Sequence, residues 1–459
     1  MALRRIAGHP SAKPARLALL LCLAIVLVPA LQLIPLPPGV WTALPNRAVE
    51  AETFRLLAQD LPWMPASLSP RATWLAMLSL LPPIAVFLGT LLLNYGERRA
   101  LSIVVIVFGV LSAFVGLAQV AEGPSSSLRF YEITNASEAV GFFANRNHLA
   151  ALLYAITVLA AAWAVEAASP PAPGRTRLDS RWLVPVIASF TVLVILVAAQ
   201  TMARSRAGLG LTIVALLGAA VLAWRDPRNA SGLTPAKLLL AATALAMMFA
   251  TQFALYRVME RFADDSVKEG RVTIARLTAE AAQHNMPVGA GMGTFVPVYG
   301  MQERAADAML DVYVNHAHND FLELWLEAGV TGLGVVALCL LWLVGRSWRL
   351  WRRDAPGTEI DVSIARAGTI IVALIVAHSA VDYPLRTGAI MAIIAFACGL
   401  IAPSLGVETS VRESGDRPQA AKFAAKRRPL SQRPTAHEPI SQHQPERWGN
   451  DVEWPKEWR

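Results

Sequence analysis

The chain has 459 residues, of which 55% are hydrophobic and 16% are charged, and its formal net charge is +8. A soluble protein is nearer half apolar and a quarter charged, so this composition predicts a membrane protein. The cysteines, Cys22, Cys339 and Cys398, each lie inside an apolar run without partner spacing, which argues against a disulfide framework and a zinc cluster. The basic residues fall in short loops and in the C-terminal tail, which indicates topology, so we expect no nucleic-acid partner.

Apolar runs long enough to cross a bilayer recur along the chain. The first, residues 17–33, follows basic residues as a cleavable signal peptide does, but more apolar runs follow, so we expect a retained signal anchor. The others lie at residues 71–93, 100–120, 147–168, 182–203, 207–224, 236–255, 321–345, 364–383 and 386–403. The sequence therefore predicts an all-α, polytopic bundle of about ten transmembrane helices.

The lysine and arginine residues of the short loops predict the orientation of these helices, because cytoplasmic loops are enriched in them. With a cytoplasmic N-terminus, the loops on the same side contain Arg98, Arg99, Arg175, Arg177, Arg181, Arg225, Arg228, Arg346, Arg349, Arg352 and Arg353. The opposite side then receives one large segment, residues 256–320. A long connection is more often functional than idle, so we expect the chemistry there.

The chain divides into three predicted regions. Residues 1–140 form N-terminal transmembrane helices, and residues 141–403 form a transmembrane core that includes the 256–320 segment. In residues 404–459, Pro, Gln, Arg and Lys replace the apolar runs, so we expect a disordered, basic, cytoplasmic tail. Its basic part either contacts anionic membrane lipids or is a solvated tail that reinforces the topology.

The stretch NHAHNDFLELWLEAGVTG, residues 315–332, places polar residues at the start of an apolar run. Asp320 and Glu323 have the spacing of an N-terminal capping box, which predicts a helix that begins near Phe321. Because a helix N-terminus attracts anions, the residues just before it can meet water and a bound phosphate together.

Several interpretations of these polar residues remain open. His318 and Asn319 either contact a phosphate or are ordinary interfacial residues of a structural cap. A metal site formed by His316, His318 and Asp320 has suitable ligand types, but nothing fixes a fourth ligand, so we predict no metal.

Two arginines, Arg204 and Arg206, interrupt the apolar sequence in the stretch ARSRAG, residues 203–208. A charge at a helix centre costs about 2.5–3.5 kcal/mol on insertion scales and less near the interface. Charged residues at such a place indicate function, and the alternative is that each side chain extends to the lipid headgroups.

The long outer segment contains an amphipathic pattern and a glycine run. Residues 271–283 predict a short helix that begins at Arg271, which is either a solvated residue or a ligand. The expected apolar face carries Val272, Ala275, Ala279 and Ala282. GAGMG, residues 289–293, lacks the spacing and context of a dinucleotide loop, so we predict a turn that approaches a ligand or a helix closely.

Arg206, Arg271 and His318 are all assigned to the same side of the membrane. A guanidinium stays charged and donates a bidentate fork to phosphate, while an imidazole is a general base near neutral pH. Together the three residues predict a site that binds a pyrophosphate and removes a proton nearby.

Four motifs resemble the O-antigen ligase and polymerase superfamily of polytopic membrane glycosyltransferases. They are GFFANRNHLAALL at residues 141–153, SRAGLGL at 205–211, GRVTIARLTAEAAQHNMPVGAGMGTF at 270–295 and HNDFLELWLEAGVTGLGVV at 318–336. The resemblance implies transfer of a glycan from a polyprenyl pyrophosphate carrier to an acceptor hydroxyl. The acceptor would be lipid A core or another glycan, and the reaction would occur on the periplasmic face of the bacterial inner membrane.

The resemblance also implies residue roles in a metal-independent, inverting transfer without a cofactor. His318 would accept the proton of the acceptor hydroxyl, and Arg206 and Arg271 would bind the pyrophosphate. Further substrate contacts are expected from Arg204, as an accessory phosphate ligand, and from Asn319 and His316, of which His316 has no counterpart assigned from the family. Asn145 and Asn147 are either structural caps or residues that line the site, and we favour the structural role. Asp382 in HSAVDYPLR is interpreted as a helix cap.

Other functions share some of these features. A repeat-unit polymerase would use the same motifs with a different acceptor. A transporter would place ionisable residues near the bilayer midplane on broken helices in matching halves, and no such halves are visible in the sequence. A structural membrane subunit would have no need of the long outer segment.

Overall fold

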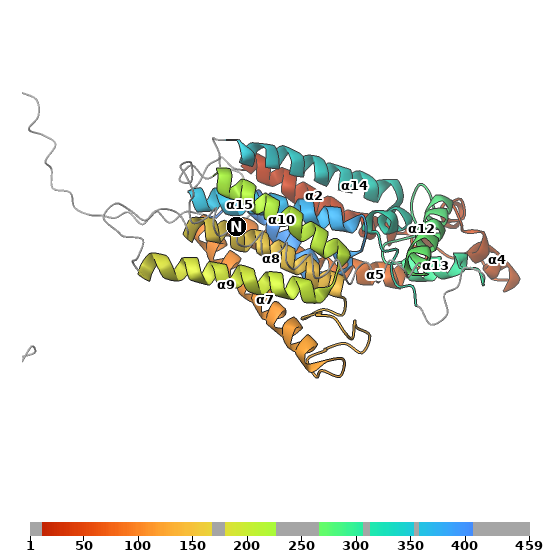
Figure 1. Cartoon of the computed structure of the whole chain (residues 1–459). Helices are drawn as coiled ribbons and strands as arrows, with labels where there is room; N and C mark the ends of the chain where they lie inside the picture. Colours follow the sequence, from red (N-terminus) through yellow and green to blue (C-terminus); the bar gives the residue numbers. More distant parts are fainter. Residues whose placement is uncertain (1–11, 168–179, 226–265, 306–312, 353–357, 407–459) are drawn as a thin grey trace, which may run out of the picture. The chain divides into compact units, whose positions relative to one another are not determined.

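The computed structural model describes residues 12–167, 180–225, 266–305, 313–352 and 358–406 (Figure 1). These residues belong to one compact unit, Met1–Glu408, and a second unit, Thr409–Arg459, lies outside the described residues. The predicted span at residues 236–255 and nearly all of the predicted tail also lie outside them.

The described chain is almost entirely helical. Its helices are α2 (Ala12–Gln32), α3 (Pro38–Trp41), α4 (Ala48–Leu56), α5 (Pro70–Ser79), α6 (Leu81–Leu92), α7 (Tyr95–Glu122), α8 (Arg146–Ala167), α9 (Ser180–Ala203), α10 (Arg206–Arg225), α12 (Ser266–His284), α13 (Phe295–Gln302), α14 (Asp320–Trp351), α15 (Glu359–Ser379), the 3-10 helix η2 (Pro384–Arg386) and α16 (Gly388–Ile401). A two-residue strand β1 (Pro35–Leu36) pairs antiparallel with β2 (Met64–Pro65).

Eight helical segments of the described residues are long and apolar enough to cross a membrane, with α5 and α6 counted together, and α16 is a shorter apolar helix. The predicted all-α, polytopic membrane fold is therefore confirmed. The 236–255 run is the one predicted span that the description does not reach.

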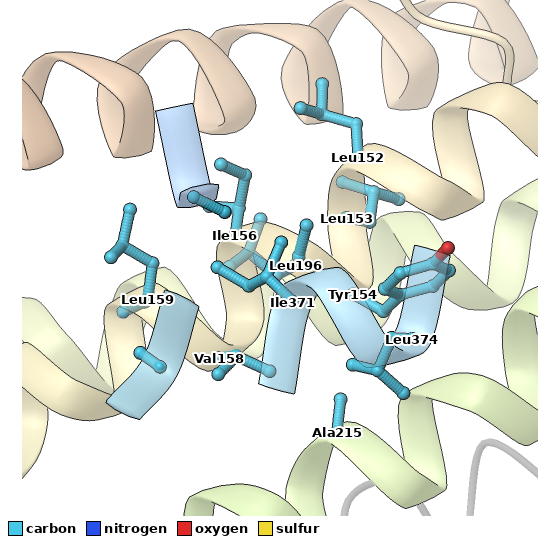
Figure 2. Close-up of a cluster of buried hydrophobic side chains, with 14 of the residues drawn as sticks. Leu152, Leu153, Tyr154, Ile156, Val158, Leu159, Leu196, Ala215, Ile371 and Leu374 are labelled. Atoms are coloured by element: carbon cyan, nitrogen blue, oxygen red, sulfur yellow. The ribbon is translucent and has the colours of Figure 1, made fainter. Parts of the chain in front are cut away.

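Helix α8 forms the centre of the bundle and is buried along nearly its whole length. It packs against α7, α9, α10 and α15. Small residues permit these close approaches between helices. At Gly109 of α7, the Cβ of any larger residue would lie only 2.5 Å from the side chain of Ile156, which is too close for two carbon atoms. Figure 2 shows the resulting apolar cluster, in which the labelled residues are Leu152, Leu153, Tyr154, Ile156, Val158 and Leu159 of α8, Leu196 of α9, Ala215 of α10, and Ile371 and Leu374 of α15.

One end of this bundle gathers the polar residues, and we call it the site end. The start of α8 and the turn after α15 meet there, because Asn147 donates a hydrogen bond to Asp382. The start of α14 joins them through a contact between His318 and Asp382. The end of α9 joins through a backbone hydrogen bond from Ala139, in the segment before α8, to Met202.

Helix α14 is broken near its start, since Gly329 has φ 54° and ψ −143°. The glycine run at residues 289–293 lies against this break, where a Cβ on Gly289 would lie 2.5 Å from the carbonyl oxygen of Glu327. Two backbone hydrogen bonds join the two segments, from Ala290 to Leu326 and from Gly291 to Glu327, and a third runs from Val330 to Pro287, just before the glycine run. The glycine run thus approaches a helix, which is one of the two outcomes that we predicted for it.

Helix α12 is amphipathic, as predicted, but its buried face is not the predicted one. Val272 is 69% exposed. The buried positions are Ile274, Leu277, Thr278, Ala281 and Ala282. The larger side chains of Ile274 and Leu277 set the orientation of the helix, because they bury more apolar area than the alanines of the expected face.

Candidate functional site

The start of α14 is capped by Asn319. Its side-chain oxygen accepts hydrogen bonds from the backbone N–H groups of Phe321 and Leu322, both at 3.0 Å. The predicted capping box of Asp320 and Glu323 is therefore wrong, although the helix begins at Asp320, within one residue of the predicted start. Asn319 takes the cap because its backbone is extended, with φ −161° and ψ 108°, which is the usual conformation of a capping residue.

His318 forms a pair with Asp382, which we call the His318–Asp382 pair. The imidazole Nδ1 lies 3.1 Å from the Oδ1 atom of Asp382. The carboxylate is almost fully buried, whereas the histidine side chain is 27% exposed. A buried carboxylate thus lies beneath an imidazole that solvent can reach.

Asp382 is ionised at neutral pH. Burial opposes ionisation, but the hydrogen bond and charge of His318, with further contributions from His378 and His148, outweigh burial and lower the pKa of Asp382 to about 2. An ionised carboxylate can only accept hydrogen bonds, so Nδ1 of His318 carries the proton. In the neutral imidazole, Nε2 is then the unprotonated nitrogen, which is able to accept a proton.

Asn147 completes the surroundings of Asp382. Its side-chain amide donates to Oδ2, the oxygen that His318 does not contact. Asn145, two residues earlier, donates to the hydroxyl of Tyr383 at 3.3 Å. Asn145 directly precedes α8 and Asn147 is its second residue, and both contact side chains of the polar site, so their structural role stays a prediction.

A second imidazole–carboxylate contact lies beside the first, and we call it the His316–Glu323 pair. Nδ1 of His316 lies 2.9 Å from Oε1 of Glu323, whose side chain is 1% exposed. The ring of Tyr383 contacts both histidines, with centroid distances of 4.4 Å to His316 and 5.0 Å to His318. Burial raises the pKa of Tyr383, so its hydroxyl stays protonated near neutral pH.

Arg386 joins three carboxylates of α14 into a buried ion cluster. Its guanidinium lies 2.7 Å from Glu327, 3.3 Å from Glu323 and 3.6 Å from Asp320. The three acids are spaced at i, i+3 and i+7, so they share one helix face. Burial alone would lower the pKa of Arg386, but the three carboxylates outweigh it and raise the pKa. The cluster fixes the turn that carries Asp382 against the start of α14.

The predicted arginines occupy the same end of the bundle. Arg206 is the first residue of α10 and is exposed. Arg204, in the turn before it, is also exposed and has φ 49°, an unusual conformation for a residue other than glycine. Arg271, on α12, is exposed, and its charge acts on His378, one helical turn before Asp382. The roles of these arginines as phosphate ligands remain predictions.

The residues of the alternative metal site have separate partners. His316 contacts Glu323, His318 contacts Asp382, and Asp320 accepts a hydrogen bond from Ser379 at 2.7 Å. Within the described ranges, no group of three or more His, Cys, Asp and Glu side chains is arranged to bind a metal ion.

Sequence reasoning missed three residues of this site. Asp382 was interpreted as a helix cap, Glu323 as half of a capping box, and Arg386 was not singled out. The sequence does contain a signal for two of them, because Asp382 and Arg386 are the only Asp, Glu, Lys or Arg residues between residues 367 and 403, a largely apolar stretch. A charge inside such a stretch is costly, which marks it as a candidate functional residue.

Comparison with known proteins adds one match. The model of the O-antigen ligase family matches residues 190–337. The matched part includes Arg204, Arg206, Arg271, His316 and His318. No curated protein matches the sequence.

Proposed function

Because the chain belongs to the O-antigen ligase superfamily and is related to its membrane glycosyltransferases, we propose that it transfers a glycan from a polyprenyl pyrophosphate carrier to an acceptor hydroxyl. The reaction is metal-independent and inverts the anomeric carbon. It takes place on the periplasmic face of the bacterial inner membrane. The acceptor is lipid A core or another surface glycan.

His318 is the general base of this reaction. Its Nε2 removes the proton of the acceptor hydroxyl while the hydroxyl oxygen attacks the anomeric carbon of the donor. Asp382 fixes the tautomer through Nδ1 and stabilises the imidazolium that forms. General base catalysis of this kind typically contributes about 10²- to 10⁴-fold to the rate.

The leaving group is the polyprenyl pyrophosphate. As the new bond between the acceptor oxygen and the anomeric carbon forms, the bond from that carbon to the pyrophosphate oxygen breaks, and the oxygen keeps the electron pair. Arg206 and Arg271 stabilise the negative charge that develops on it. Arg204, Asn319 and His316 contribute further substrate contacts.

The observation that carries this proposal is the 3.1 Å contact between His318 Nδ1 and Asp382 Oδ1. A solvent-accessible imidazole with one nitrogen tied to an ionised carboxylate has the arrangement of a general base.

The test compares glycans in cells. A strain that lacks the protein is complemented with the native form, with His318→Ala or with His284→Ala, all at matched membrane abundance. His284 is an exposed residue at the end of α12 and serves as the control histidine. Surface glycans and carrier-linked glycans are then separated on gels.

We expect His318→Ala to fail like the deletion, with carrier-linked glycan accumulating, and His284→Ala to restore the native pattern. Full-length unattached chains would identify a ligase, and single repeats would identify a polymerase. A native pattern with His318→Ala would refute the proposal.

A further inference from the structure

The loop before α14 is anchored by a single carboxylate, that of Glu323. Oε1 lies 2.9 Å from Nδ1 of His316 and 3.3 Å from Nε of Arg386. Oε2 accepts the backbone N–H of Ala317 at 2.9 Å. Glu323 therefore contacts the two residues that precede His318 in the chain.

His318 itself has a strained backbone, with φ 51°. This left-handed conformation is unfavourable for a residue with a Cβ, and it persists only where the surrounding structure imposes it. Strained residues of this kind cluster at functional sites.

The chain is fixed on both sides of this strained residue. On the N-terminal side, the N–H of Ala317 donates to Glu323. On the C-terminal side, Asn319 caps α14, and its amide donates to the carbonyl oxygen of Ala380 at 2.9 Å. Asn319 thus ties the loop to the turn that carries Asp382.

Glu323 also connects this loop to the buried ion cluster around Arg386. Its side chain is 1% exposed, and it shares Arg386 with Glu327, which is fully buried. Charge-assisted hydrogen bonds of this kind are stronger than neutral ones and are sensitive to geometry. The loop is thereby attached to the ion cluster rather than to a mobile surface group.

We propose that Glu323 is a positioning residue for His318. Through Ala317 and His316 it fixes the loop so that the imidazole meets Asp382 on one side and the acceptor hydroxyl on the other, and it touches no substrate. This inference rests on the proposed role of His318 as the base. Small displacements of a catalytic group are costly, since an error of about 1 Å can reduce turnover about 100-fold.

The test uses Glu323→Gln with Glu327→Gln as its matched control. Both residues are buried glutamates on the same face of α14 and both pair with Arg386, whereas the contacts to His316 and Ala317 are made by Glu323. In Glu323→Gln, the new amide keeps the shape and can still accept from Ala317, but it presents N–H groups to Arg386, which can only donate, and to Nδ1 of His316, which must then change its tautomer. The purified full-length variants are assayed with membranes of the deletion strain, which contain both donor and acceptor.

We expect Glu323→Gln to lower the apparent kcat about 10- to 100-fold and to leave the apparent KM for the added membranes within about twofold, because Glu323 itself contacts no substrate. Glu327→Gln should retain kcat within about threefold while its Tm falls as much as that of Glu323→Gln. Equal losses of kcat in the two variants would show that the cluster only supports folding, and would overturn the inference.

Two further variants keep the inference testable. If Glu323→Gln does not reach the membrane, Glu323→Asp replaces it. The shorter side chain keeps the negative charge but no longer reaches His316 and Ala317, so native turnover in that variant would refute the positioning role. His318→Ala is assayed in parallel. An active His318→Ala defeats the proposed function itself, whereas an inactive His318→Ala with a fully active Glu323→Gln defeats the positioning role alone.

Discussion

The two imidazole–carboxylate pairs are similar in geometry and different in surroundings. In both, Nδ1 of the histidine contacts a buried carboxylate, the histidine side chain is 27% exposed, and the ring lies against Tyr383. Asp382 is otherwise bonded to a neutral amide, that of Asn147. Glu323 is bonded to a guanidinium and to a backbone N–H.

This difference predicts different roles for the two pairs. The charge of Asp382 is directed to its imidazole, so it can stabilise an imidazolium that forms during a reaction. The charge of Glu323 is already balanced by Arg386, so Glu323 stabilises a protonated His316 less than Asp382 stabilises a protonated His318. The role of Glu323 is instead to fix the loop. A carboxylate beside a histidine is therefore evidence for catalysis only when its remaining partners are also known.

The largest effect should come from removing the charge of the first pair. In Asp382→Asn, the side chain keeps its shape but no longer stabilises a cation on His318. We expect turnover to fall about 10²- to 10⁴-fold, the range that general base catalysis supplies. The matched change in the second pair, Glu323→Gln, should cost less, and an assay of initial rates in deletion-strain membranes compares the two. A milder loss in Asp382→Asn than in Glu323→Gln would reverse the comparison.

The next effect concerns the cation that supports both pairs. Arg386→Gln leaves Asp320, Glu323 and Glu327 buried without their counter-ion, and breaking a buried ion pair in this way costs about 3–5 kcal/mol. We expect a large fall in Tm and in the amount of protein recovered from membranes.

The control for this change is Arg55→Gln. Arg55 contacts Glu52 at 3.4 Å, and the two side chains are 71% and 55% exposed. A pair this exposed contributes at most about 1 kcal/mol. Similar Tm values for the two variants would show that the buried cluster stabilises no more than a surface ion pair.

The sequence predicts the transmembrane helices well because bilayer thickness imposes their length. Any run of about twenty apolar residues is conspicuous, whichever neighbours it acquires. The break in α14 gives no such signal, since Gly329 lies inside an apolar run where a glycine is unremarkable. The crowding appears only in the structure, where a Cβ on Gly329 would lie 2.8 Å from the backbone nitrogen of Gly289.

The site is harder to predict because its partners are far apart in the chain. His318 and Asp382 are separated by 64 residues, and Asn147 and Asp382 by 235. Glu323 was mistaken for a capping residue because its spacing from Asp320 fits a local rule. The structure directs its carboxylate instead to His316 and Ala317. Local patterns therefore identify candidate residues, whereas the pairing between them depends on tertiary packing.

A smaller effect should appear in the pH dependence of stability, through the carboxylate of Asp382. The pKa of Asp382 falls from 3.8 to about 2 on folding, so its ionised form stabilises the protein above the unfolded pKa, and this stability is lost as the pH falls from about 4 to about 2. The contribution is about 2 kcal/mol. Between pH 6 and pH 3, we expect the Tm of the native protein to fall more than the Tm of Asp382→Asn. The other carboxylates titrate in both proteins, so the difference between the two falls is due to Asp382. Equal falls would mean that the charge of Asp382 does not stabilise the fold.

The smallest effect should come from the second imidazole. In His316→Phe, an aromatic ring still packs against Tyr383, but the contact with Glu323 is lost, while Ala317 and Arg386 remain bonded to that carboxylate. We expect turnover to fall only about 3- to 10-fold, which corresponds to the loss of one hydrogen bond. The same substitution at the other pair, His318→Phe, removes the base and should abolish transfer. If both phenylalanine variants were equally inactive, His316 would itself take part in the reaction, and the clearest functional difference between the two pairs would disappear.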